Sequence, residues 1–515
     1  MYKITEVSQD IGGNMKALRI DTKDNVAVLL DDVNTGDEIE ITGYGKLHIE
    51  KNIRRGNKIA LMDIKKGRAI IKYGAVIGYA TEDIREGSWV HTHNVVTGLD
   101  GIIDYRYEPE VVSPDGKIDT SCISHEFMGY LRTNGEVGIR NEVWIIPTVA
   151  CVNEVAKKLE ELGRAYVRDS RKEIDEVVAF THPYGCSQTG DDKDATEKVL
   201  AGLATHPNAG GVLLLGLGCE NSGVEAVIAK MSEYDKTRVS YLICQNVEDE
   251  IQAGEALLKE LINRASKDER KKSDIDKLTL GLKCGGSDGL SGITANPLLG
   301  SVADRLINAG GSCIMTEVPE MFGAEKNLMN RCKNEKLFNE LVNMINRFKT
   351  YFIQNNQTIY ENPSPGNIKG GITTLEDKSL GCTQKSGTSQ ICGIIDYGDK
   401  RKDRGLNLLY APGNDPVAAT ALAAAHVQMI LFTTGRGTPF AAPVPTMKIS
   451  SNSELAKKKS NWIDYDAGKL VDGKDRNKAA DELFEKIIAC AEGAKVCSEK
   501  AGYHDMAIFK RGITL

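Results

Sequence analysis

From Gly129 to the C-terminus, short apolar runs alternate with segments of helical periodicity, and this alternation constrains the fold of the 515-residue chain more than any other feature. Strands that are separated by helices form mostly parallel, doubly wound sheets. Because a charged stretch at 267–277 interrupts the pattern, we predict two Rossmann-like, mostly parallel α/β regions, at 129–270 and 271–515. The expected strands are 143–146, 177–180, 211–215, 239–243, 278–282, 312–315, 406–410 and 429–432, and the expected helices are 151–162, 224–231, 247–262, 335–352, 416–424 and 479–491.

Residues 1–100 have a different texture, in which short β-forming runs are broken by glycine-containing turns. That spacing is typical of a small β domain. Near its end His91 and His93 stand two residues apart, so we expect them on one face of a strand, where both imidazoles reach the same metal or substrate. A strand with an ordinary polar face is the alternative. Residues 101–128 carry turn chemistry without periodicity, and we predict a linker there.

The composition limits the classes of function. The formal net charge is −7 and the chain has no basic tract, which argues against a nucleic-acid partner. The N-terminal residues lack the apolar core of a signal peptide, and no apolar run approaches the length of a membrane span. The 12 cysteines form no CxxC pair. We therefore expect reduced thiols in a cytoplasmic protein with no membrane partner, and homo-oligomers are compatible with the sequence.

The expected strand at 278–282 runs into a polar loop at 283–297 that has four glycines within nine residues. A strand, a glycine-rich loop and a helix N-terminus together offer backbone N–H groups to an anion. A tight turn is the alternative, but it requires fewer glycines. The loop is therefore predicted to form the floor of a binding site.

Other polar loops follow other expected strands. In open α/β sheets, ligands bind beyond the carboxyl ends of the strands. We predict that these loops meet in one crowded polar pocket. The residues concerned are His182 and Cys186, Cys219 and Glu220, Lys283 to Asp288, Glu317, the segment 380–388, and the segment 433–438.

The residue types in this pocket indicate their chemistry. Lysine and arginine suit a carboxylate, hydroxyl groups suit a polyol, and histidine and carboxylates suit proton transfer. For each cysteine alone, a buried apolar role is the alternative, and Glu220 and Asp288 also fit as helix N-terminal charges. The predicted catalytic residues are His182, Glu220, Lys283 and Asp288, with Glu317 a further candidate acid or base; the predicted substrate-binding residues are Ser287, Lys385, Thr434 and Arg436; the predicted metal ligands are His91, His93, Cys186, Cys219 and Cys284.

Several long motifs resemble the altronate dehydratase family, which also contains galactarate dehydratase and is similar to the sulfolactate sulfo-lyase subunits. They are GYLRTNGEVGIRN at 129–141, GLGCE at 216–220, KCGGSD at 283–288, NPSPGN with KGG at 362–371, and FTTGRGTP at 432–439. The first hundred residues resemble the small β-clip domain, called SAF, that this family fuses to its catalytic region.

This resemblance implies a hydro-lyase that depends on Fe(II). The implied reaction is dehydration of a sugar acid, foremost D-altronate to 2-dehydro-3-deoxy-D-gluconate in hexuronate (galacturonate) catabolism. The His91–Asn94 and Gly381–Lys385 segments look more like the altronate branch than the galactarate branch. Galactarate or another aldonate is the alternative substrate, and a sugar-acid binding protein without catalysis is the alternative function.

Two kinds of iron centre are compatible with the sequence. In the first, which we favour, His91 and His93 complete a mononuclear Fe(II) site against the α/β floor. In the second, the thiolates of Cys186, Cys219 and Cys284 hold an iron–sulfur cluster with one open iron. The docking of the SAF domain on its own subunit or on a neighbour stays open at this point.

Overall fold

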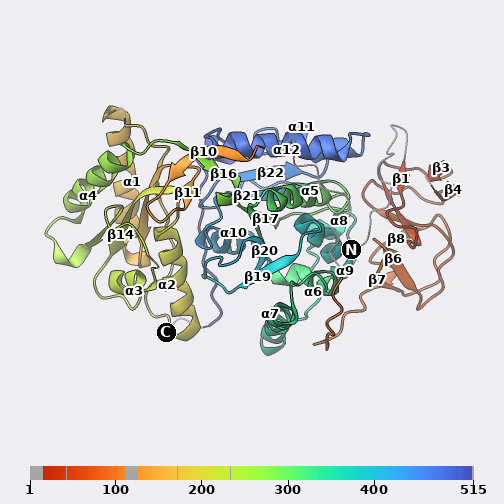
Figure 1. The fold of residues 1–515 in the computed structure, drawn as a ribbon. Coiled ribbons are helices and arrows are strands. Elements are labelled where there is room, and N and C mark those ends of the chain that lie inside the picture. Colours follow the sequence, from red (N-terminus) through yellow and green to blue (C-terminus); the bar gives the residue numbers. More distant parts are fainter. Residues whose placement is uncertain (1–15, 42, 111–123, 171, 232, 513–515) are drawn as a thin grey trace.

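The computed structural model describes residues 16–41, 43–110, 124–170, 172–231 and 233–512. The described chain forms three parts in a row (Figure 1): the β-rich N-terminal part at one end, the larger C-terminal α/β part in the middle and the smaller α/β part at the other end. Most of the expected linker, 111–123, and the N-terminal segment inspected for a signal peptide lie outside the described residues. No helix among the described residues has the length and apolar content that a membrane span requires.

The N-terminal part is a set of small antiparallel sheets around two apolar cores. The small β domain predicted for residues 1–100 is confirmed among the described residues. His91 and His93, however, do not lie on a strand: β8 ends at Val90 and the histidines occupy the turn that follows it. The sheets are β1-β2-β5-β8, β3-β4 and β6-β7-β9. The strands are β1 (Ala17–Leu18), β2 (Val26–Leu29), β3 (Glu38–Ile41), β4 (Gly45–His48), β5 (Lys58–Ala60), β6 (Ala69–Lys72), β7 (Ala75–Ala80), β8 (Trp89–Val90) and β9 (Val95–Val96).

The smaller α/β part, the second domain, contains a four-stranded sheet of order β13-β12-β14-β15 in which all pairings are parallel. Every residue of β12 and β14 is buried, as expected for central strands with helices on both faces. Asp249 caps α4 by accepting from two backbone N–H groups of its first turn. The elements are β12 (Glu142–Pro147), α1 (Asn153–Ser170), β13 (Val177–Ala179), α2 (Gly190–Ala204), β14 (Ala209–Gly216), α3 (Val224–Lys230), β15 (Val239–Ile243) and α4 (Glu250–Ala265).

The C-terminal part, the third domain, contains a fully parallel seven-stranded sheet of order β19-β20-β18-β17-β21-β22-β23. Strand β17, which leads into the glycine-rich loop, lies near the centre of this sheet. The strands are β17 (Thr279–Cys284), β18 (Ser312–Met315), β19 (Ile391–Ile395), β20 (Gly405–Leu409), β21 (Met429–Thr434), β22 (Thr446–Ser450) and β23 (Tyr465–Asp466). The helices are α5 (Ala295–Asn308), α6 (Glu325–Met329), α7 (Glu335–Gln354), α8 (Pro365–Lys369), α9 (Leu375–Cys382), α10 (Asp415–Ala424), α11 (Ser453–Lys458), α12 (Arg476–Ala491) and α13 (Cys497–Lys500).

A small antiparallel sheet joins the second and third domains. Its order is β11-β10-β16, from β10 (Glu126–Leu131), β11 (Val137–Gly138) and β16 (Lys271–Asp274). The charged stretch at 267–277 thus contributes a strand, and the expected linker ends inside β10. The buried Arg140 side chain adds to this junction, because it donates to the backbone oxygen of Cys490 and to the carboxylate of Glu499.

Candidate active site

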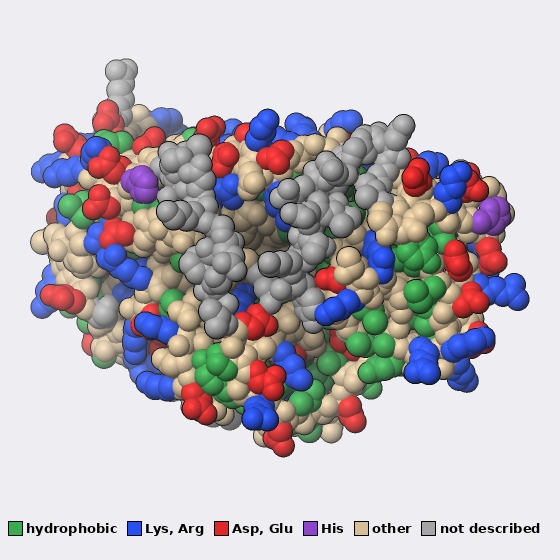
Figure 2. All heavy atoms as spheres, turned by 45° about the vertical axis from the view of Figure 1, so that its right-hand side comes forward, with side chains coloured by type: hydrophobic (Ala, Val, Ile, Leu, Met, Phe, Trp, Pro, Cys, Tyr) green, Lys and Arg blue, Asp and Glu red, His purple; other side chains and the backbone are tan. Residues whose placement is uncertain are grey.

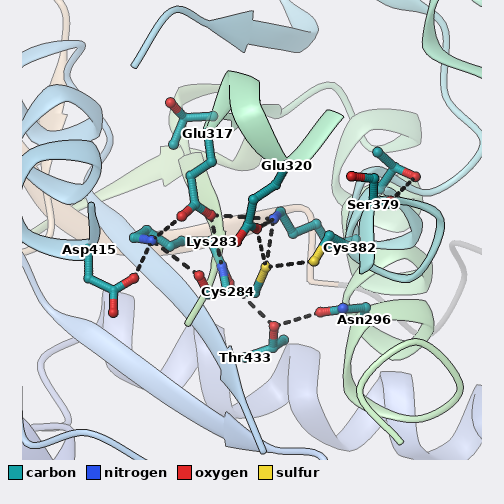
Figure 3. A network of polar contacts seen from close by, with 12 residues as sticks. Lys283, Cys284, Asn296, Glu317, Glu320, Ser379, Cys382, Asp415 and Thr433 are labelled. Carbon is teal, nitrogen blue, oxygen red and sulfur yellow. Dashed lines mark hydrogen bonds and ion pairs between the residues drawn. The ribbon is translucent and has the colours of Figure 1, made fainter. Parts of the chain in front are cut away.

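A buried network of charged side chains lies at the carboxyl edge of the seven-stranded sheet (Figure 3). Lys283 comes from the end of β17, Glu317 and Glu320 follow β18, and Asp415 begins α10 after β20. These strands are neighbours in the sheet, so residues more than 100 positions apart meet at one edge. Lys385 reaches the same place from the turn η6 (Thr383–Ser386) after α9.

Lys283 is the centre of this network. Its Nζ lies 2.5 Å from Glu317 Oε1 and 2.7 Å from Asp415 Oδ1, and it also donates to the Cys284 carbonyl. Burial alone would lower the pKa of this lysine, but the carboxylates of Glu317 and Asp415 outweigh burial and raise it. Lys283 is therefore a permanently charged cation held between two carboxylates.

Glu317 and Glu320 are fully buried neighbours with different environments. Burial, reinforced by repulsion from Glu320, raises the pKa of Glu317 to about 7 against the pull of the nearby lysines. Burial also opposes ionisation of Glu320, but Lys378 and Lys385 hold its pKa well below the ordinary value. The Glu317 backbone has φ of +72°, an uncommon conformation for a non-glycine residue. The pair thus contains one carboxyl that titrates near neutrality, as a general base requires.

Two thiols adjoin the carboxylates. Cys284 Sγ lies 3.0 Å from Glu320 Oε2 and 3.4 Å from Cys382 Sγ, and Lys385 Nζ lies 3.0 Å from Cys284 Sγ. The donor atoms of Cys284, Glu320 and Cys382 are all within 4.8 Å of one another, which is a spacing that a metal ion can use.

The charge balance argues against iron at these three residues. Lys378 Nζ is 2.8 Å from Glu320 Oε1, and Lys385 already contacts the Cys284 thiol. Three buried ammonium groups, those of Lys283, Lys378 and Lys385, face three carboxylates, those of Glu317, Glu320 and Asp415. A divalent cation would enter a site whose negative groups are already neutralised, so this donor set does not fit iron in the arrangement observed.

The network reaches the surface through Asp415, whose side chain is 33% exposed. A Cβ at position 285 would stand 2.7 Å from both Asp415 carboxylate oxygens, so glycine is required there for the carboxylate to approach the β17 loop. Arg436 is exposed beside the same loop, against Gly286. Within the described part of the chain, the structure shows no hydrogen bond or ion pair for the Arg436 guanidinium. It is therefore available to an anionic ligand.

Three other residues that were predicted for this edge make contacts within the protein. Asp288 accepts hydrogen bonds from Ser291, Ser451 and Asn452, and these contacts tie the β17 loop to the end of β22. The Ser287 side chain is buried, and its carbonyl accepts from Asn367 Nδ2. Thr434 Oγ1 accepts from the Gly437 N–H and so shapes the loop that carries Arg436. Their predicted roles in catalysis and substrate binding stay predictions.

The SAF-like domain docks on this edge within the same chain. Lys58 Nζ and Lys72 Nζ lie 2.8 and 2.9 Å from the two oxygens of Asp377 on α9, and all three side chains are buried. Burial and the neighbouring Lys72 lower the pKa of Lys58 to about 8, although Asp377 opposes this effect. His91 is close by. Burial, followed by the Lys58 charge, lowers its pKa to about 4, and its Nδ1 is buried without a hydrogen-bond partner.

The second domain holds the remaining predicted residues. His182 is buried and both ring nitrogens contact backbone, at Pro147 O and Tyr184 N. Glu220 accepts from Thr148 Oγ1 and from the N–H groups of Leu217 and Gly218. Partial burial opposes these hydrogen bonds, but they hold the pKa of Glu220 below its ordinary value. Cys186 and Cys219 are exposed on the neighbouring loops.

The expected pocket is thus divided in this chain. Lys283, Lys385, Glu317 and Cys284 come together, whereas His182, Glu220, Cys186 and Cys219 lie on a separate sheet, at the far end of the molecule from the SAF-like domain (Figure 1). The five predicted iron ligands are distributed over three domains. Sequence reasoning missed Glu320, Lys378 and Asp415 as members of the network, whereas Cys382 lies in the segment 380–388 that was predicted for the pocket. Only Asp415 had a usable signal, since Asn-Asp-Pro after an apolar run marks a helix start at a carboxyl edge.

On the face drawn in Figure 2, which turns the SAF-like end forward, basic and acidic side chains are interspersed over the described surface.

Comparison with known proteins covers nearly the whole chain. Residues 15–98 match the altronate/galactarate dehydratase SAF domain, 129–266 the second domain of D-galactarate dehydratase/altronate hydrolase, and 275–514 the D-galactarate/altronate dehydratase C-terminal domain. The altronate dehydratases of Escherichia coli (strain K12) and Bacillus subtilis (strain 168) are 48% and 47% identical over 97% of this chain, and the matches cover 100% and 99% of those proteins. The galactarate dehydratase (L-threo-forming) of Escherichia coli (strain K12) is 30% identical over 96% of both chains.

Proposed function

This chain belongs to the D-galactarate/altronate dehydratase family, and we propose that it is a hydro-lyase that converts D-altronate to 2-dehydro-3-deoxy-D-gluconate and water. The two altronate dehydratases are nearly half identical to it over their whole lengths, whereas the galactarate dehydratase is 30% identical. This difference supports altronate over galactarate.

The reaction sets three requirements for the site. A base removes the proton at C2, beside the carboxylate, and the C3 hydroxyl departs with a proton as water. The resulting enol then tautomerises to the 2-keto acid. Because proton loss next to a carboxylate builds a second negative charge, the site must hold a cation against it before the reaction begins.

We place the active site in the third domain because of one observation, the Lys283 ammonium group between Glu317 and Asp415. In our proposal Arg436 binds the substrate carboxylate, since its guanidinium is exposed beside the loop and suits bidentate binding. Asp415 is the exposed end of the network and receives the C2 proton. Lys283 stabilises the developing charge, and Glu317, with a pKa of about 7, holds the proton within the network.

Iron dependence, which the resemblance implies, is part of the proposal. When bound, iron would supply a Lewis acid that polarises the departing hydroxyl. The predicted mononuclear site at His91 and His93 does have one supporting feature, the buried and unpaired Nδ1 of His91. Its neighbour His93 is exposed, and both rings contact Trp89.

We further propose that the enzyme acts in the cytoplasm, in hexuronate catabolism, and that it can form homo-oligomers. Altronate is a sugar acid that a hexuronate yields on isomerisation and reduction, which supports this metabolic setting.

The test is a substrate panel. Iron-loaded protein is incubated anaerobically with altronate, galactarate and other aldonates and aldarates, and 2-keto acid is measured. We expect altronate to give the highest kcat/KM. Preference for galactarate would reassign the substrate within the family, and the absence of product from every member would refute the hydro-lyase.

A further inference from the structure

The exposed cysteines of this protein are concentrated at one place. Among the 11 cysteines in the described chain, all of them free thiols, three are exposed: Cys151, Cys186 and Cys219. Cysteine is among the residues most often buried, so an exposed thiol calls for a reason. All three belong to the second domain, and the other described cysteines are buried or half-buried.

Each exposed thiol follows a different strand of one parallel sheet. Cys151 follows β12, Cys186 follows β13 and Cys219 follows β14. These strands are adjacent, in the order β13-β12-β14, and their parallel pairing places all three loops at the carboxyl edge. The three loops therefore lie at one edge of the sheet although their segments are far apart in sequence.

Hydrogen bonds hold the three loops against each other. The Ala150 N–H, next to Cys151, donates to the Tyr184 carbonyl at 2.9 Å. The Ser222 N–H donates to the Gly185 carbonyl, and the Ser187 N–H donates to Asn221 Oδ1, both at 3.1 Å. The loop of Cys186 is thus fastened on one side to the loop of Cys151 and on the other side to that of Cys219.

The backbone at these loops is in unusual conformations. Gly185 and Ser187, on either side of Cys186, have φ of +102° and +58°, and Gly218 before Cys219 has φ of +126°. A Cβ at position 185 would collide with the Thr148 carbonyl. Left-handed residues that flank a thiol re-aim it away from the regular chain direction, and such strain is typical of functional sites.

Polar atoms without partners occur in the same loops. Gln188 Nε2 and Ser222 Oγ are buried and make no hydrogen bond, and so is Asn153 Oδ1. Gln188 is 2% exposed and Ser222 is fully buried. Each of these residues lies within three positions of one of the exposed cysteines. Unpaired buried polar groups are costly, so these three atoms call for a partner.

We propose that Cys151, Cys186 and Cys219 bind an iron–sulfur cluster at the carboxyl edge of the second domain. Thiolates from separate loops are the ligands of such clusters, and three of them leave one iron of a cubane cluster without a protein ligand. Cys244, after β15, is half-buried and packs against the apolar core of the domain, so it is excluded as the fourth ligand. Cys151 thus takes the place that the sequence prediction gave to Cys284, whose thiol contacts Lys385.

The assignment is tested by the cluster itself. Full-length protein is reconstituted anaerobically with ferrous iron and sulfide, and iron, acid-labile sulfide and visible charge-transfer absorption are measured. We expect about four iron and four sulfide per chain, and loss of sulfide to background in each of Cys151→Ser, Cys186→Ser and Cys219→Ser. Because these side chains are exposed, the variants should retain the wild-type unfolding transition.

Two matched variants serve as controls. Cys244→Ser removes the thiol at the end of the fourth strand, and Cys392→Ser removes a half-buried thiol of the third domain; both should keep the full sulfide content. Iron or zinc bound without sulfide would overturn the proposal, and so would a cluster that survives in the Cys186→Ser and Cys219→Ser variants.

The same samples separate this inference from the proposed function. If protein that holds iron but no sulfide dehydrates altronate, the cluster proposal is refuted and the proposed hydro-lyase function stands. If protein that holds the cluster dehydrates no sugar acid, the proposed function is refuted and the cluster proposal stands.

Discussion

Lys283 Nζ lies 2.5 Å from Glu317 Oε1, and both side chains are completely excluded from solvent. A buried ion pair contributes little net stability compared with apolar packing, but removal of one partner leaves an uncompensated buried charge. The Lys283–Glu317 pair is therefore better explained by a role in function than by a contribution to stability. Its position at the carboxyl edge, next to the partly exposed Asp415, fits a cation that is held ready for a negative transition state.

The first prediction concerns stability. Lys283→Met leaves Glu317 without its closest cation and should lower the free energy of unfolding by about 3–5 kcal/mol, measured by urea denaturation. Lys349→Met is the matched control. Lys349 forms a buried ion pair with Glu325, with an N–O distance of 2.9 Å, and this pair does not involve the β17 loop. A similar loss is expected there. A Lys283→Met protein as stable as wild type would show that the charge of Glu317 is not held by Lys283.

The second prediction concerns pH. In the proposed mechanism Asp415 receives the C2 proton, and Glu317 must be ionised to hold that proton within the network; burial raises the pKa of Glu317 to about 7. The ionised fraction therefore grows as the pH rises through about 7, and kcat/KM for altronate should rise with it. Glu317→Gln should abolish turnover at every pH. A kcat/KM that is flat between pH 5 and 9, values chosen to span about two units on either side of this pKa, would remove Glu317 from proton transfer.

The third prediction concerns substrate binding. Arg436→Ala should raise the KM for altronate roughly 10- to 100-fold, the equivalent of about 1.5–3 kcal/mol for hydrogen bonds to a charged group. Stability should be unchanged because the guanidinium is exposed. Arg168→Ala, at an exposed arginine near the end of α1, is the control. Equal KM values in the two variants would contradict carboxylate binding by Arg436.

The fourth prediction concerns the docked SAF-like domain. Asp377→Asn leaves the Lys58 and Lys72 ammonium groups buried with no carboxylate between them, so it should release the domain. Lys58→Met keeps the Lys72–Asp377 pair and should have a smaller effect. Amide hydrogen exchange over residues 16–98 measures the difference. Equal protection in both variants would show that Asp377 does not hold the interface.

Strands β19, β22 and β23 were not expected, but the other four strands of the third domain were predictable because buried parallel strands are nearly continuous apolar runs, as at 312–315 and 429–432. The partners of Lys283 were not. The sequence identifies a cation after a strand. Glu317 and Asp415 become its neighbours only because the strands are ordered β20-β18-β17 in the sheet, and the periodicity of single strands does not predict that order.

Two other features show the same limit. The spacing of His91 and His93 is typical of a strand, yet pairing in the SAF-like domain ends at Val90 and a turn begins. Lys58 and Lys72 lie on short strands and have no local sign of burial, because the carboxylate that compensates them is more than 300 positions away.

The most direct measurement of the central claim is the initial rate of 2-keto acid formation from D-altronate by iron-loaded wild-type, Lys283→Met and Lys349→Met proteins, each verified as folded. We predict product from wild type and from Lys349→Met, and a loss on the order of 10²–10³ or more in kcat for Lys283→Met, as for removal of a preorganised charge-stabilising group. A near-wild-type rate in Lys283→Met would show that the Lys283 ammonium does not stabilise the transition state.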